Sequence, residues 1–272
     1  MRADGLGSWW LALVSGLALG TLVSPTVAQD GAADEDAEGA EAEEPPPSGF
    51  FDGWDGRFLV GVFGTTGNSE SNTIEFITDG ERDTDESRSS YELLYNFSRS
   101  DGEIGANNAR LTLANDYKIP DSDWFAYVEG ISEYDELKAW DGRFLIEAGV
   151  GYQWIDEEDE RLVSRVGGAG ELEVGSADTS WNPLLTFETE YETAIDERQD
   201  FSAFVGALFD LSDGENVRVT AGAEYSWLID PDRNMSLVGR VETEFDAQPG
   251  VQNGVEDNEF DTSYSILLSW EY

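Results

Sequence analysis

Five glutamates stand at two-residue intervals in two stretches of the chain. Glu188, Glu190 and Glu192 follow one another at this spacing, and Glu171 and Glu173 repeat it in the stretch before. Residues two apart on an extended strand share a face, so these carboxylates would be crowded together. Crowded carboxylates can bind cations or act as an acid and a base. The alternative is a charged lining in which they pair with arginines on neighbouring strands.

Two residue types that carry much enzyme chemistry are absent, because the 272 residues include no histidine and no cysteine. The chain therefore lacks a thiolate nucleophile, a Ser-His-Asp triad, disulfides, and histidine or cysteine ligands for a metal. The acidic stretches Asp79 to Glu86 and Asp156 to Glu160 do not match the ligand spacing of an EF-hand loop. We interpret both as solvated turns, and we predict no catalytic residue, no metal site and no cofactor.

The charge of the chain is strongly negative. It has 58 Asp and Glu against 15 Lys and Arg, a net charge of −43. Such a balance excludes nucleic acid as a partner, because phosphate backbones require a basic surface. It favours either solubility in a salty environment or an interior that selects cations.

The first 49 residues differ in composition from the rest. Residues 1–28 combine Arg2, an apolar core and a small-residue site at Thr26-Val27-Ala28, which predicts a signal peptide; an uncleaved membrane anchor is the alternative. Residues 29–49 carry eight acids and no base and include three consecutive prolines, which predicts a disordered linker. From residue 50 to residue 272 the texture is uniform and predicts one domain.

That domain consists of alternating apolar and polar residues in runs of about 10 to 14, separated by turn dipeptides such as Asp101-Gly102 and Asp141-Gly142. The last run is the clearest, because Phe260, Tyr264 and Trp270 share one face with other apolar residues while serines occupy the other. A period of two indicates strands rather than helices. We expect twelve strands, at roughly 57–65, 70–78, 89–99, 107–118, 123–135, 142–155, 160–175, 183–193, 200–211, 215–228, 234–246 and 259–272.

An even number of long alternating strands is typical of an all-β, antiparallel up-and-down transmembrane β-barrel. The runs match the 9–11 residues that cross a bilayer when tilted. The polar face is too charged for a packed core, and we predict that it lines a lumen. The glycines Gly149, Gly151, Gly167, Gly168 and Gly170 lack the following helix of a dinucleotide site, so we interpret them as allowing curvature or keeping the lumen from filling. The candidate lining residues are Arg110, Arg143, Arg165, Arg218, Arg240, Glu147, Glu171, Glu188, Glu190, Glu224 and Glu242.

Aromatic residues gather near the ends of the predicted strands. If both termini lie in the periplasm, one set falls near the periplasmic edge of the barrel. Rings with a polar tip favour the headgroup level, so we predict a girdle in contact with outer-membrane lipid. Its members are Trp124, Trp154, Trp227, Trp270 and Tyr272.

Several short motifs, taken in their order and spacing, resemble the family of unknown function 481 (DUF481), described as salt-induced outer-membrane proteins (YdiY-like). They are Gly67-Asn68-Ser69, Asn115-Asp116-Tyr117, Glu133-Tyr134-Asp135, Arg143 followed by the 148–152 stretch, and the aromatic last strand. The resemblance covers about residues 54–272. It implies an outer-membrane barrel with no established activity and no catalytic residues to carry over. Tyr272 is also similar to the C-terminal aromatic by which the barrel-assembly machinery recognises its substrates.

Twelve strands lie between the eight whose interior side chains can fill and the sixteen that leave an open channel. We therefore expect a narrow, cation-favouring pore, or an envelope structural protein connected with salt or osmotic stress. A soluble, exported β-sheet binding protein is the first alternative, since alternation alone also suits a soluble sheet. A barrel enzyme that works with carboxylates is the second.

Overall fold

The structure is a computed structural model. It describes residues 53–65, 71–100, 103–138, 140–176, 179–248, 251–252, 255–256 and 259–272. The chain divides into two units, Met1–Pro46 and Pro47–Tyr272, and the second contains every described element. The expected signal peptide at 1–28 and almost all of the linker at 29–49 belong to the first, and both lie outside the described residues.

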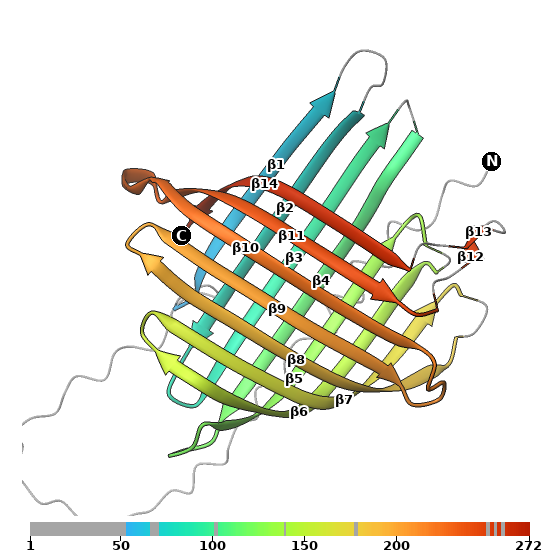
Figure 1. Cartoon of the computed structure of the whole chain (residues 1–272), viewed down its shortest axis with the longest axis horizontal. Coiled ribbons are helices and arrows are strands. Elements are labelled where there is room, and N and C mark those ends of the chain that lie inside the picture. Colours follow the sequence, from blue (N-terminus) through green and yellow to red (C-terminus); the bar gives the residue numbers. More distant parts are fainter. Residues whose placement is uncertain are drawn as a thin grey trace, which may run out of the picture. The chain divides into compact units, whose positions relative to one another are not determined.

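Twelve strands of the described ranges form one closed antiparallel barrel, in which each strand pairs with its neighbours in the sequence and β1 closes against β14 (Figure 1). A short 3-10 turn, η1 (Pro231–Arg233), joins β10 to β11, and the two-stranded sheet of β12 (Val251–Gln252) and β13 (Val255–Glu256) lies between β11 and β14. None of the described helices is long or apolar enough to span a membrane. The barrel strands are β1 (Asp55–Thr65), β2 (Ser71–Asp83), β3 (Ser87–Ser100), β4 (Glu103–Lys118), β5 (Trp124–Asp135), β6 (Gly142–Glu157), β7 (Glu160–Val174), β8 (Trp181–Asp196), β9 (Gln199–Asp210), β10 (Val217–Asp230), β11 (Met235–Asp246) and β14 (Phe260–Glu271).

The predicted strands agree with the observed ones to within a few residues, except at the end of β2. That strand continues to Asp83, so the interpretation of 79–86 as a solvated turn is wrong for its first five residues. Asp79 lies on the inner face, and its carboxylate is 3.0 Å from Nε of Arg57. Gly80 takes a position on the outer face that an apolar side chain occupies elsewhere. The alternation of apolar and polar residues is therefore absent from the last residues of β2, although the strand continues through them.

The two faces of the barrel wall differ in chemistry. Outward positions carry exposed apolar side chains, such as Ile146 (55% exposed) and Tyr264 (86%). Inward positions carry most of the arginines and carboxylates of the strands, joined by ion pairs. This is the reverse of a soluble sandwich, which would bury its apolar faces against one another.

One part of the interior is apolar. Leu59, Ile77, Val238 and Leu267 are 0–1% exposed and pack together, with Leu94 against them. They come from β1, β2, β11 and β14, and so they lie directly behind the line along which the barrel closes. Leu267 interrupts the serine face of the last strand, which was the signal for this cluster in the sequence.

The closing seam is shorter than the pairing on either side of it. β1 pairs with β14 from Arg57↔Glu271 to Val60↔Leu268, whereas β1 pairs with β2 along its whole length and β14 with β11 as far as Phe260. Beyond the short seam, β1 and β14 diverge (Figure 1). The buried cluster therefore lies behind the short segment in which β1 and β14 pair, and it supports the closure there.

We expect Leu59→Ala to lower the free energy of unfolding by about 2–5 kcal/mol, because it leaves a cavity behind the seam. Leu237→Ala is the matched control, since Leu237 is 38% exposed on the outer face and its loss creates no internal cavity. Urea unfolding in detergent micelles measures both. Equal midpoints for the two variants would contradict a supporting role for the cluster.

Candidate functional site

Two cavities lined by described residues lie in the interior of the barrel. The larger has a volume of about 880 Å³ and lies at the end of the barrel that holds the β6–β7 turn and the last residues of β14. The smaller, about 270 Å³, lies at the other end. No residue lines both cavities.

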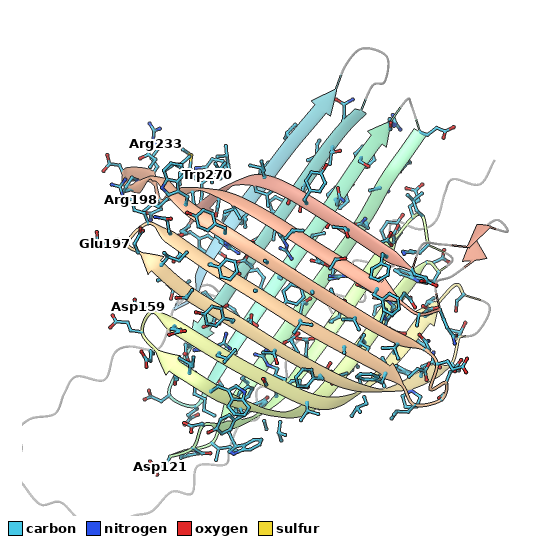
Figure 2. All side chains as sticks on the ribbon, in the orientation of Figure 1. Asp121, Asp159, Glu197, Arg198, Arg233 and Trp270 are labelled. Carbon is cyan, nitrogen blue, oxygen red and sulfur yellow. The ribbon has the colours of Figure 1, made fainter. Side chains whose placement is uncertain are left out.

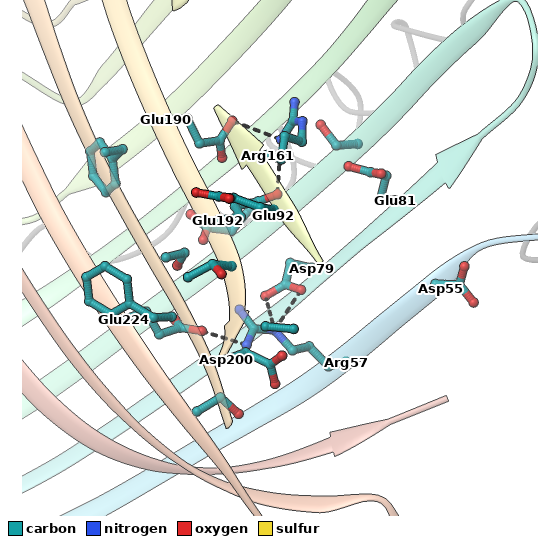
Figure 3. Close-up of a pocket in the computed structure, with 18 of the residues that line it drawn as sticks. Asp55, Arg57, Asp79, Glu81, Glu92, Arg161, Glu190, Glu192, Asp200 and Glu224 are labelled. Carbon is teal, nitrogen blue, oxygen red and sulfur yellow. Dashed lines mark hydrogen bonds and ion pairs between the residues drawn. The ribbon is translucent and has the colours of Figure 1, made fainter. Parts of the chain in front are cut away.

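The larger cavity is strongly acidic (Figure 3). Fifteen Asp and Glu residues line it, against five arginines. Five of the acids belong to the stretch from Asp156 to Glu160, so the predicted turn borders the lumen. Among the described residues, no three carboxylates are arranged so that they could hold a metal ion. The arginines of this cavity are Arg57, Arg88, Arg161, Arg165 and Arg240.

Ion pairs cross the lumen between strands that are not neighbours in the sheet. Arg57 of β1 contacts Glu224 of β10 at 2.6 Å, an interaction drawn in Figure 3. Such pairs divide the interior instead of lining one wall. The others are Arg240–Glu92 (3.2 Å), Arg165–Asp116 (2.9 Å), Arg218–Glu171 (2.5 Å) and Arg110–Glu242 (3.4 Å).

The structure places the predicted lining residues on the inner face. The row of Glu188, Glu190 and Glu192 pairs with two arginines of β7: Arg165 contacts Glu188 at 2.8 Å, and Arg161 contacts Glu192 at 3.1 Å. Paired carboxylates of this kind form a charged lining, and they are poorly suited to act as an acid and a base. Inward residues that the prediction omitted are Arg57, Arg88 and Arg161, although Arg161 shares the face of Arg165 at a spacing of four.

Aromatic rings fill part of the interior. The Tyr127 hydroxyl donates to Glu147, which also accepts a hydrogen bond from Thr186 Oγ1 at 2.6 Å. A Cβ on Gly149 would lie 2.8 Å from a ring carbon of Tyr127, and a Cβ on Gly167 would lie 2.4 Å from the Tyr127 hydroxyl.

The Phe125 ring likewise occupies the space above Gly151, where a Cβ would lie 2.1 Å from it. The interpretation that the glycines keep the lumen from filling is therefore wrong. Gly149, Gly151 and Gly167 make room for rings that fill it, while Gly170 lies on the outer face against Trp181.

Trp140 is a site residue that sequence reasoning missed. It is 9% exposed, lines the smaller cavity, and its ring centroid lies 5.0 Å from the Arg143 guanidinium carbon. Its place in the connection between β5 and β6, outside any alternating run, left no periodic signal.

The five predicted girdle residues lie on the outer face. Their exposed fractions are 50% for Trp124, 62% for Trp154, 49% for Trp227, 37% for Trp270 and 45% for Tyr272. Figure 2 places Trp270 near the rim where the charged residues Glu197, Arg198 and Arg233 lie in turns. Trp154 and Trp227 therefore point away from the lumen.

Comparisons with solved structures give two porins and an outer-membrane channel. A NanC porin is 12% identical, with 80% of this chain and all of that chain covered and a TM-score of 0.47. The KdgM porin, solved with disordered oligogalacturonate, is 8% identical, with coverage of 80% and 99% and a TM-score of 0.44. An outer-membrane channel from Pseudomonas putida F1 is 9% identical, with coverage of 86% and 99% and a TM-score of 0.45.

No curated protein matches the sequence. A family model does match, over residues 59–272, and it is described as a protein of unknown function, DUF481. This range includes nearly the whole barrel, from the inner Leu59 of the first strand to the last residue. The chain belongs to the DUF481 family.

Proposed function

We propose that the protein is an outer-membrane barrel whose lumen is a narrow pore that favours cations. Its outer face supports the membrane placement, because Ile146, Leu185 and Tyr264 are among many large apolar side chains exposed there. A surface of this kind is costly in water and suited to lipid. A closed barrel also satisfies the backbone hydrogen bonds that hydrocarbon cannot.

The proposed orientation puts both ends of the barrel chain, and the larger cavity, on the periplasmic side. The turns at this rim are short and charged, as the β6–β7 and β10–β11 connections show. The girdle tryptophans would then lie at the inner headgroup level. The last strand, which ends near Tyr272, is the segment that we propose the barrel-assembly machinery reads.

The acidic excess of the larger cavity is the observation that carries the cation preference. Fifteen acids and five arginines leave a negative field, and a cavity with low-dielectric walls concentrates the counter-ion. The crossing ion pairs keep the passage narrow. An anion would meet repulsion at the mouth, where the Asp156 to Glu160 stretch lies.

We expect planar-bilayer recordings in a KCl gradient to give a reversal potential shifted toward the equilibrium potential of potassium. The shift should correspond to a several-fold higher permeability for potassium than for chloride. Glu192→Gln and Asp200→Asn, both in the cavity wall, should reduce that preference. Glu197→Gln is the matched control, because Glu197 lies in the β8–β9 turn and does not line the cavity. Chloride preference in the unaltered protein would overturn the proposal.

A second candidate is an envelope structural protein. The observation that favours it is the filling of part of the interior by the buried Phe125 and Tyr127 rings and by the crossing ion pairs. A folded barrel that gives no conductance at any voltage would select this candidate. A role in salt or osmotic stress, which the family resemblance implies, predicts that cells without the protein grow more slowly at high salt.

A further inference from the structure

The two strands that close the barrel leave facing backbone edges beyond their short seam. Residues 61–65 of β1 pair with β2 on one side, and residues 260–267 of β14 pair with β11 on the other. Within the described residues, neither segment has a partner across the seam. We call the space between these two edges the wedge.

Unpaired strand edges are costly in hydrocarbon, because no water reaches their N–H and C=O groups. The existing register offers a solution that needs no slip. Continuing from Val60↔Leu268, it would pair Val62 with Ile266 and residue 64 with Tyr264. The register therefore allows the wedge to close by further pairing, and an occupant of the wedge would keep it open.

The walls of the wedge are amphipathic. On the outer face, Val62, Ile266 and Tyr264 are 70%, 59% and 86% exposed. On the inner face, Ser265 Oγ donates to Glu75 of β2 across the wedge at 3.5 Å. An occupant that fits has an apolar tail toward the lipid and a polar head toward the lumen.

The charge at the inner wall selects the head. Glu92 and Glu242 both contact Arg240, at 3.2 and 3.4 Å. Glu75, which lies beside them, has no ion pair with any described lysine or arginine within 4.0 Å. Arg240 acts on Glu75 from beyond that distance, so a cationic head would supply the close ion pair that Glu75 lacks.

We propose that the β1–β14 seam is a lateral port between lumen and membrane, closed by zipping and opened by an amphiphile with one apolar tail and a cationic head. The buried cluster around Leu59 and Leu267 stops the opening at the four existing pairs. The port rests on the membrane placement of the barrel but not on ion conduction, so a silent pore would leave it standing.

The absence of cysteine from the chain makes disulfide trapping a clean test. The full chain is placed in phosphatidylcholine vesicles, with Val62→Cys and Ile266→Cys combined, and oxidised. Zipped partners lie within disulfide reach, and strands that have parted do not. We expect the disulfide to form, and dodecyltrimethylammonium to lower its yield several-fold. Non-reducing gels measure the yield, since a looped chain migrates faster when unfolded.

Val60→Cys with Leu268→Cys is the matched control, because these residues already pair and their disulfide should form with or without the amphiphile. Tetramethylammonium has no tail and laurate has an anionic head, so neither should protect the 62–266 pair from oxidation, that is, lower its disulfide yield. Adding Glu75→Gln should remove the protection but leave the disulfide yield without amphiphile unchanged. If the 62–266 pair never cross-links while the control pair does, the port is overturned. If laurate lowers the 62–266 yield as much as dodecyltrimethylammonium does, the cationic ligand is overturned.

Discussion

Gly149→Ala is expected to prevent the barrel from folding or to destabilise it severely. A Cβ at this position would lie 2.2 Å from the carbonyl oxygen of Val166 and 2.6 Å from Cα of Gly167. Both are backbone atoms of the paired strand, so relief requires β6 and β7 to move apart. Overpacking that forces side chains off their rotamers and shifts the backbone typically costs about 1–3 kcal/mol and occasionally more, and a clash with two backbone atoms belongs at the upper end. The measurement is the temperature at which the folded form loses its distinct gel mobility.

Two glycine variants separate the clash from a general intolerance of substitution. Gly130→Ala, in β5, should leave that temperature unchanged or raise it slightly, because nothing lies within 4 Å of a Cβ there. Gly151→Ala should be harmful but rescued by Phe125→Val, since its close contacts are with the Phe125 ring. A Gly149→Ala barrel as heat-stable as the Gly130→Ala barrel would show that the strands are not in close contact at this point.

Strand positions could be predicted because the wall of a barrel imposes a period of two on nearly every strand. The prediction of the last strand at 259–272 agrees with β14, where Tyr264 and Trp270 face outward. It failed at the end of β2, where Asp79 pairs with Arg57 and Gly80 replaces an apolar residue. Periodicity is read from contrast, and a strand with polar or small residues on both faces shows none.

The sequence predicted which residues of the site lie on the inner face, but not which of them contact one another. Alternation placed Arg110 and Arg165 inside, because parity needs only local spacing. It could not show that Arg165 reaches Asp116 three strands away, since that depends on the tilt and closure of the whole barrel. The same limit hid the Tyr127 ring above Gly149 and Gly167, because a glycine in a strand suits either an open lumen or a close neighbour.

Removal of one crossing ion pair is expected to have the largest effect on transport through the proposed pore. Arg110 lines neither of the two cavities, and it lies 2.7 Å from Glu133 and 3.4 Å from Glu242 on the far wall. Arg110→Ala should raise single-channel conductance several-fold and strengthen the preference for potassium, because it removes both bulk and positive charge from an ion pair that crosses the lumen. The fold should survive, since Glu133 keeps Arg143 at 2.5 Å and Glu242 keeps its other partner.

Arg233→Ala is the matched control, because it removes the same charge from a side chain that is 76% exposed in the β10–β11 turn. If the position of the charge matters, conductance changes for Arg110→Ala alone. If only the net charge of the protein matters, the two variants shift the potassium preference equally and leave the conductance unchanged. That result would place the barrier to ions elsewhere in the lumen, and the Tyr127 and Phe125 rings would be the next side chains to remove. Tyr127→Ala, which leaves every crossing ion pair in place, would then be the variant that conducts.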